Sequence, residues 1–151
     1  MSSPGQTPGL SQTQSVHKLA GHQAQISKAQ NVTEVLTKLE PLLAGQGDAR
    51  GQRWQLCLEG KGIRRSFYFK GFKKAWNFMD AVAQECKARN HHPEWWNAYN
   101  HIFIQWTTHR PEGLSINDVE MAAWCDEQAR AHEERMDVEP EPLKIFGFVE
   151  T

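Results

Sequence analysis

Two runs of alternating apolar and polar residues, separated by a short glycine-containing break, constrain the fold of this chain most. Within residues 53–69 the apolar side chains recur at every second position on both sides of Gly60, Lys61 and Gly62. A period of two is typical of β-strands that bury one face, and glycine supplies the backbone conformations that tight turns require. The pattern therefore predicts a β-hairpin over residues 53–69.

Three other segments have apolar side chains at the three- and four-residue spacing of amphipathic helices: residues 31–43, 72–89 and 115–134. The second segment is the strongest, and its apolar stripe predicts that it covers one face of the sheet. Pro41 removes a backbone donor in the first segment, so the helix either kinks there or begins a second turn. Ser115 with Asp118 three residues later is an N-terminal capping signature for the third helix.

A further alternating run, residues 99–108, predicts another strand, and residues 94–97 leave room for a short strand before it. Both faces of the 99–108 run carry apolar side chains. We therefore expect its outer face to contact something other than water, such as another subunit. The predicted order of elements along the chain is α-β-β-α-β-β-α.

Composition limits the classes of function that fit this chain. Of its 151 residues 17 are basic and 18 are acidic, which gives no electrostatic indication of a dedicated nucleic-acid or anionic-membrane binder. The three cysteines are widely spaced in apolar segments, as expected for buried free thiols in a reducing compartment. No window approaches the roughly 20 apolar residues that span a bilayer. We expect a cytoplasmic protein, with a nuclear location also open and a mitochondrial one disfavoured because no arginine precedes Arg50.

The two ends of the chain differ in composition from its middle. Residues 1–30 are rich in serine, glutamine, glycine and threonine and predict a disordered tail. Residues 31–134 hold the periodic segments and predict one domain. Residues 135–151 predict a C-terminal tail that is first acidic and then apolar over residues 145–149. This end is too apolar for a solvated tail, and docking on the domain or on a partner are both open.

Four of the seven histidines lie close together in the sequence: His91, His92, His101 and His109. Imidazole exchanges protons near neutral pH, so the cluster favours acid/base chemistry on a flat heterocycle that a neighbouring tryptophan could enclose. Surface or helix-capping imidazoles are a second interpretation. A metal site is a third, and it is disfavoured because adjacent side chains in an extended segment point to opposite faces. No serine or cysteine nucleophile motif accompanies the histidines.

Four groups of residues in this region share their spacing with a known family: His91-His92-Pro93-Glu94-Trp95, Tyr99-Asn100, Thr107-Thr108-His109 and Gly113-Leu114-Ser115 with Asp118. They closely resemble the pterin-4a-carbinolamine dehydratases, also known as dimerisation cofactors of a homeodomain transcription factor. The resemblance covers about residues 31–132. It implies an α+β fold, a four-stranded antiparallel sheet with three helices packed on one face, that assembles as a homodimer or homotetramer.

The resemblance also implies an activity. Family members dehydrate 4a-hydroxytetrahydrobiopterin to quinonoid dihydropterin and water, which recycles the cofactor of the aromatic amino acid hydroxylases. Neither a cofactor nor a metal is implied for the dehydratase itself. The family's catalytic histidines carry over onto His91, His92 and His109, and His101 is not among them. We expect His91 and His92 to share the acid and base roles and His109 to bind and orient the pterin; which histidine is the acid stays open.

The expected substrate contacts are Asn90, Trp95, Thr107, Thr108 and Asp118. Trp95 would enclose the pterin ring, and the two threonines would hydrogen-bond it. Asp118 either orients a histidine or the ligand, or only caps its own helix, and both roles are open.

Two residues depart from the family pattern. Lys87 and Asn90 stand where the family often has carboxylates. Their absence removes negative charge beside the imidazoles and acceptors for the pterin amines, which is expected to weaken activity. The alternative is therefore a non-catalytic module of the same fold, such as a transcriptional coactivator that binds a protein partner. The three histidines favour the enzyme.

Overall fold

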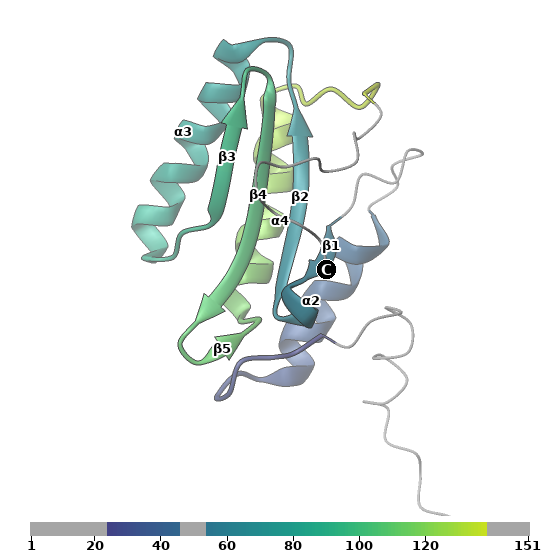
Figure 1. Cartoon of the computed structure of the whole chain (residues 1–151), viewed down its shortest axis with the longest axis vertical. Helices are drawn as coiled ribbons and strands as arrows, with labels where there is room; N and C mark the ends of the chain where they lie inside the picture. The colour runs from purple at the N-terminus through teal and green to yellow at the C-terminus, as the bar shows by residue number, and fades with distance from the viewer. Residues whose placement is uncertain (1–23, 46–53, 139–151) are drawn as a thin grey trace, which may run out of the picture.

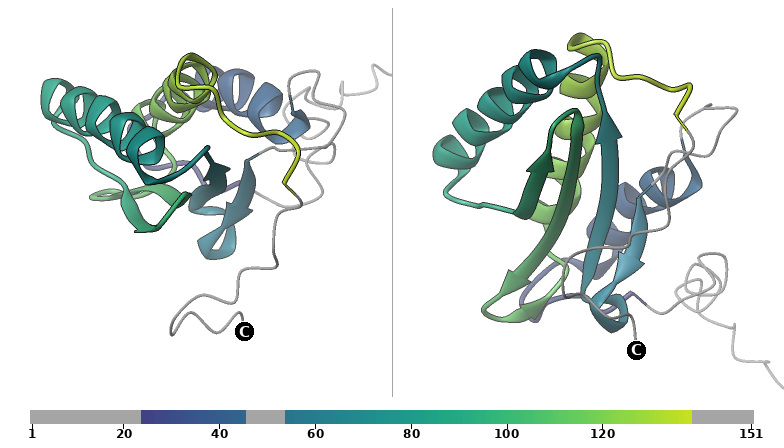
Figure 2. Two further views of the ribbon diagram at one scale, coloured as in Figure 1. Left: turned by 90° about the horizontal axis from the view of Figure 1, so that it is seen from above. Right: turned by 45° about the horizontal axis from the view of Figure 1, so that its top comes forward.

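The structure, a computed structural model, describes residues 24–45 and 54–138. Its helices and strands are α2 (Val32–Ala44), β1 (Gln55–Cys57), β2 (Gly62–Tyr68), α3 (Phe72–Arg89), β3 (Glu94–Ala98), β4 (His101–His109), β5 (Glu112–Gly113) and α4 (Ile116–Ala131). The three helices lie behind the sheet in Figure 1, and the view from above in Figure 2 shows them as one layer on one face. Residues 1–23 and 139–151, which make up most of the predicted tails of residues 1–30 and 135–151, lie outside the described residues.

The strands follow the order β1-β2-β4-β3, each neighbouring pair is antiparallel, and the short β5 pairs with the end of β4. The predicted α+β fold, with a four-stranded antiparallel sheet and three helices on one face, is thus confirmed, and β5 is an addition. A single turn of 3-10 helix, Leu58–Gly60, joins β1 to β2 in the predicted hairpin. Glu94 of β3 lies opposite Gln105, the middle residue of β4, so the last four residues of β4 extend beyond the start of β3.

Alternation along the strands places one set of side chains under the helices. Ile63 and Phe67 of β2 and Ile104 and Trp106 of β4 are all 0% exposed and belong to one core. The ring of Phe78 from α3 lies 5.0 Å from that of Phe67. Each such burial stabilises the fold by about 1.5–3 kcal/mol. The core therefore fixes the helices on the sheet, and with them the residues at the helix ends.

Helix α2 continues through Pro41 to Ala44. Pro41 cannot donate to the carbonyl of Thr37 one turn earlier. Both residues are exposed, so water can satisfy that carbonyl and the helix need not end. Asn31 begins the helix by accepting a hydrogen bond from the Glu34 amide at 3.1 Å.

The sequence predicts a disordered tail up to residue 30, whereas the structure pairs part of residues 24–30 with Leu114, the residue that follows β5. The Ser27 amide donates to the Leu114 carbonyl at 2.8 Å, and the Leu114 amide donates to the Gln25 carbonyl at 2.8 Å. Gly113 permits this approach, since a Cβ there would lie 2.6 Å from the Ser27 nitrogen. These are backbone bonds to a distant segment, and the polar composition of residues 24–30 gives no sign of them.

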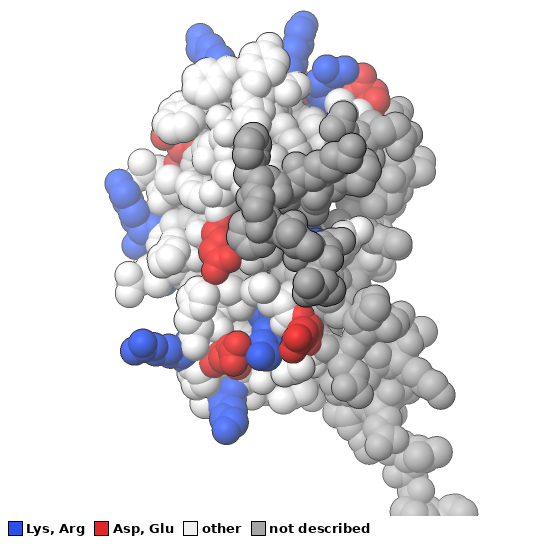
Figure 3. All heavy atoms as spheres, in the orientation of Figure 1, with Lys and Arg blue, Asp and Glu red and all other residues white. Residues whose placement is uncertain are grey.

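The other face of the sheet carries Trp96 and Phe103, whose rings stack at 5.8 Å. In Figure 3, which views that side, lysines and arginines lie apart from one another on the described surface, with carboxylates between some of them. The visible described face therefore has no continuous basic patch of the kind that nucleic acids require. Among the residues described, no helix has both the length and the apolar character needed to cross a membrane.

Candidate active site

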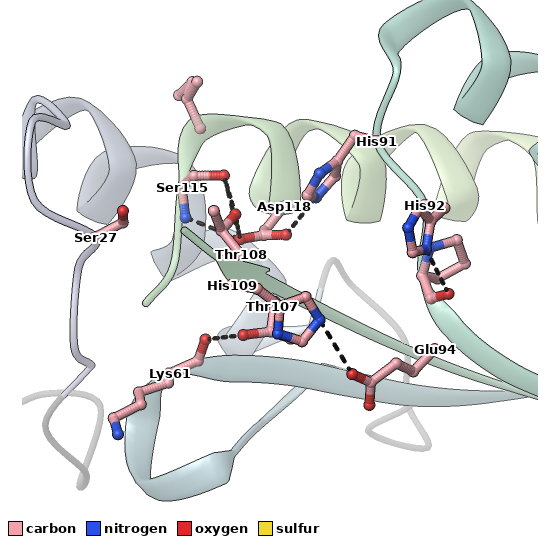
Figure 4. Close-up of polar contacts among 12 residues, drawn as sticks. Ser27, Lys61, His91, His92, Glu94, Thr107, Thr108, His109, Ser115 and Asp118 are labelled. Carbon is pink, nitrogen blue, oxygen red and sulfur yellow. Dashed lines mark hydrogen bonds and ion pairs between the residues drawn. The ribbon is translucent and has the colours of Figure 1, made fainter. Parts of the chain in front are cut away.

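The topology brings three of the predicted histidines to one end of the sheet. His91 and His92 lie between the end of α3 and the start of β3, and His109 is the last residue of β4. β3 and β4 are antiparallel neighbours, and β4 continues for four residues past Gln105, the partner of Glu94, to reach His109. Figure 4 shows the three imidazoles around this end, with Asp118 at the start of α4.

Asn90 makes the turn that directs these histidines toward the sheet. It adopts the left-handed conformation, with φ 51° and ψ 41°, and its amide bonds back to the last turn of α3. Asparagine tolerates this conformation better than most residues that carry a Cβ. Asn90 therefore has a structural role as the helix C-cap, which accounts for one of the two departures from the family pattern. Lys87, the other, has an exposed side chain.

His91 is held on two sides. Its Nε2 lies 2.6 Å from Oδ1 of Asp118, and its ring stacks on the indole of Trp106 with centroids 5.5 Å apart and planes 17° apart. The Asp118 side chain is 0% exposed and that of His91 is 14% exposed. The carboxylate binds the imidazole at Nε2, so Nδ1 is the ring nitrogen left to act on a ligand.

The second carboxylate oxygen of Asp118 caps helix α4. Oδ2 accepts a hydrogen bond from the Ser115 amide at 2.9 Å and lies 3.2 Å from the Ser115 hydroxyl. The capping box predicted from Ser115 and Asp118 is confirmed. Asp118 therefore makes both kinds of contact that the sequence leaves open, because Oδ2 bonds to the helix cap and Oδ1 contacts His91.

His92 and His109 are less constrained than His91. The contact of His92 Nδ1 with the Pro93 carbonyl is 3.5 Å long, and the His92 side chain is exposed. The His109 side chain is 69% exposed, and its Nε2 lies 3.4 Å from Oε1 of Glu94. Glu94 also accepts a hydrogen bond from the side chain of its cross-strand partner Gln105 at 2.8 Å. Glu94 is not among the residues predicted for the site, and its position two residues after His92 is the signal that the sequence offers for it.

The remaining predicted contacts divide between two environments. The Thr108 hydroxyl lies 2.8 Å from Oδ2 of Asp118, on the helix side of β4. The Thr107 hydroxyl instead donates to the Lys61 carbonyl at 2.8 Å, and Thr107 is 8% exposed. Trp95 is partly buried against the core. Thr108 and Asp118 thus lie together with His91, whereas Thr107 uses its hydroxyl within the sheet.

His101 lies away from the other three histidines. Its Nε2 is 2.9 Å from the Ser66 hydroxyl, and its ring stacks on Tyr68 at 4.2 Å. The rings of Trp96 and His101 also meet edge to face, with centroids 4.7 Å apart. These contacts suit a residue of the outer sheet face, as the sequence predicts for His101.

The thiols do not supply a nucleophile to this site. Cys57, Cys86 and Cys125 are all free, and burial raises the pKa of Cys57 to about 12 and that of Cys86 to about 11. Burial also raises the pKa of Cys125 well above the ordinary range. Each therefore stays protonated near neutral pH. Within residues 24–45 and 54–138, no group of three or more His, Cys, Asp or Glu side chains is arranged to hold a metal ion.

Comparison with known proteins gives one consistent result. Residues 28–128 match a family model described as Pterin 4 alpha carbinolamine dehydratase. A Novosphingobium aromaticivorans protein named "Putative pterin-4-alpha-carbinolamine dehydratase" is 45% identical over 69 residues, 46% of this chain and 72% of that protein. A Rhizobium rhizogenes protein of the same name is 35% identical over 92 residues, 61% of this chain and 91% of that protein.

A solved structure has the same fold. The Brucella melitensis protein described as transcriptional coactivator/pterin dehydratase superposes with a TM-score of 0.54 at 32% sequence identity, over 66% of this chain and 96% of that one. The family match spans the described elements from α2 to most of α4, and so includes all three histidines and Asp118. This chain therefore belongs to the pterin 4 alpha carbinolamine dehydratase family.

Proposed function

We propose that this protein dehydrates 4a-hydroxytetrahydrobiopterin to quinonoid dihydropterin and water, and so takes part in tetrahydrobiopterin recycling. The observation that carries the proposal is the pair formed by His91 and buried Asp118, which has two further imidazoles at the same end of the sheet. A helix cap alone requires no histidine on the second carboxylate oxygen.

The reaction needs two proton transfers and no oxidant or reductant. The bond between C4a and the hydroxyl oxygen breaks as that oxygen accepts a proton and leaves as water. A ring nitrogen loses a proton, and its electron pair forms the new C=N bond. Imidazoles that exchange protons near neutral pH suit both transfers, and a positioned acid or base contributes about 10²- to 10⁴-fold.

The contacts support a division of roles between the histidines. An ionised Asp118 can only accept, so it favours the His91 tautomer with the proton on Nε2; Nδ1 is then the acceptor nitrogen, which suits His91 to the role of the base that takes the ring-nitrogen proton. His92, with one long contact to a carbonyl, can turn to deliver a proton to the leaving oxygen. His109 binds and orients the pterin from the end of β4, with Glu94 beside it.

Stopped-flow measurement of carbinolamine dehydration tests this proposal. The unmodified protein should exceed the uncatalysed rate, and His91→Ala and His92→Ala should each lower kcat by about 100-fold or more. His109→Ala should act mainly on KM, because its role is binding. His101→Ala is the matched control and should keep the wild-type rate. An unmodified protein that does not exceed the uncatalysed rate contradicts the enzyme assignment.

A binding role is the second candidate, and it is favoured by α3. Phe72 and Trp76 are 50% and 48% exposed, and their rings stack at 5.9 Å on the solvent side of the helix. Two large exposed aromatic rings side by side are typical of a protein interface. We propose that this face assembles the homodimer or homotetramer, or holds a protein partner such as a transcription factor.

Light scattering distinguishes these assemblies from a monomer. Replacing Phe72 and Trp76 together by serine should reduce the molar mass from that of an oligomer to the monomer's 17.3 kDa. Lys73→Ser, a change on the same helix without loss of an aromatic ring, is the control. An unmodified protein that is already monomeric at micromolar concentration argues against the assembly.

A further inference from the structure

Thr108 connects strand β4 to the carboxylate that holds His91. Its hydroxyl oxygen lies 2.8 Å from Asp118 Oδ2 and 2.7 Å from Ser115 Oγ (Figure 4). The Ser115 hydroxyl is in turn 3.2 Å from the same Oδ2. Three oxygens thus form a triangle at the side of Asp118 that faces away from His91.

The number of hydroxyl protons limits which hydrogen bonds can form among these three oxygens. The two hydroxyls supply one proton each, and the carboxylate supplies none. Two of the three contacts can therefore be hydrogen bonds at one time, and in every arrangement at least one hydroxyl donates to Oδ2. The contact from Thr108 is the shorter of the two that reach Oδ2, and a charged carboxylate is a stronger acceptor than a hydroxyl.

Thr108 lies on strand β4, whereas Ser115 is the N-cap of helix α4. The bonds from Ser115 are local to the α4 capping box and fix Asp118 only relative to its own helix. Among the described residues, Thr108 and His91 are the side chains outside α4 and its cap that hydrogen-bond the carboxylate. Two positions before Thr108, Trp106 stacks on His91, and one position after it comes His109.

We propose that Thr108 is a positioning residue: its hydroxyl fixes the plane of the Asp118 carboxylate so that Oδ1 faces His91 Nε2. This proposal rests on the proposed dehydratase function for its kinetic consequence only. It assigns the Thr108 side chain to the carboxylate rather than to the pterin. The strand thereby sets the mutual placement of His109, which it carries, and His91, which it supports through Trp106 and Thr108.

Kinetic measurements on three variants test this role. Thr108→Val replaces the hydroxyl by a methyl group of similar size and should lower kcat about tenfold with KM unchanged within about twofold. Thr108→Ser keeps the hydroxyl and should restore kcat to within about threefold of wild type. Thr37→Val, the same substitution at an exposed threonine of α2 whose hydroxyl bonds to Thr33, should behave as wild type. A Thr108→Val protein with raised KM and unchanged kcat, or a serine variant as impaired as the valine variant, overturns the proposal.

A spectroscopic measurement separates this proposal from the proposed function. In nitrogen-15 spectra of the full chain, the proton on His91 Nε2 should be protected from solvent exchange in wild type and in Thr108→Ser. It should exchange about tenfold faster in Thr108→Val. Thr108→Ala takes the place of the valine variant if that protein does not fold. Equal exchange rates in all variants overturn the positioning role. If the exchange rates differ as expected but the wild-type protein has no dehydratase activity, only the enzyme assignment is overturned.

Discussion

Replacing Asp118 by asparagine is the most informative single change. It keeps the shape of the side chain but replaces one hydrogen-bond acceptor, a carboxylate oxygen, by a donor, an NH₂ group. Oδ2 faces the Ser115 amide at 2.9 Å, and the amide oxygen of asparagine must take this position to keep the cap. The NH₂ group then occupies the position of Oδ1, 2.6 Å from His91 Nε2. Two donors would meet there, so His91 has to move its proton from Nε2 to Nδ1.

The substitution should affect activity and stability differently. The new tautomer carries a proton on the nitrogen that acts as the proposed base, so kcat should fall by about 10²- to 10⁴-fold, the usual contribution of a positioned base. The fall in the free energy of unfolding should be modest. Hydrogen bonds to a charged group contribute about 1.5–3 kcal/mol and neutral ones about 0.5–1.5 kcal/mol, but the variant also no longer buries a charge. We expect a net loss of about 1–2 kcal/mol, which lowers Tm by about 4–15 °C in a domain of this size.

Single-turnover dehydration kinetics and thermal unfolding measure the two effects separately. Glu127→Gln, the same carboxylate-to-amide change at an exposed position of α4, is the control and should alter neither quantity by much. The nitrogen-15 shifts of the His91 ring report the tautomer directly. A folded Asp118→Asn protein that keeps kcat within about threefold of wild type, or that keeps the proton on Nε2, would refute the reasoning about Oδ1.

Three further predictions concern stability. Hydrogen bonds from Lys38 and Arg89 hold the pKa of Glu120 below its ordinary 4.5, so the ionised Glu120 stabilises the fold fully above pH 4.5 and loses this effect as the pH falls through the lowered pKa. The Tm difference between wild type and Glu120→Gln should therefore shrink between pH 7 and pH 3, and a constant difference contradicts this. Gly113→Ala should lower Tm by several degrees, because φ is +132° and the new Cβ would overlap backbone, and an unchanged Tm would contradict the close approach of the N-terminal segment. Ile104→Ala, at a site with 0% exposure, should cost about 2–5 kcal/mol in urea unfolding, and a cost below about 1 kcal/mol would argue against the observed packing.

Local patterns predicted most of the fold. The period of two gives the β1–β2 hairpin, and the apolar stripe gives α3 with both of its bounds as found. The spacing of Ser115 and Asp118 gives the start of α4. These features depend on residues within one or two turns of each other, so the sequence contains everything that they require.

The parts that the sequence did not predict depend on distant segments. The bonds that Gln25 and Ser27 make with Leu114 join backbone groups far apart along the chain, and every residue except proline carries the same backbone donor and acceptor. The stacking of Trp106 on His91 depends on which face of β4 meets the end of α3. Single-sequence periodicity places Trp106 in the core but does not say which helix end lies above it.

Asp118 shows how one residue can give an ambiguous signal in a sequence and a specific one in a structure. The spacing of Ser115 and Asp118 is fully explained by a capping box, so their presence alone says nothing about catalysis. The cap uses only Oδ2, however, and leaves Oδ1 buried without a role in the helix. A buried carboxylate oxygen needs a partner, and here the partner is an imidazole at the end of another helix. The one carboxylate joins the start of α4, the end of β4 and the end of α3, so changes that loosen the cap should also displace His91. Substitutions of Asp118 should therefore lower stability and activity together.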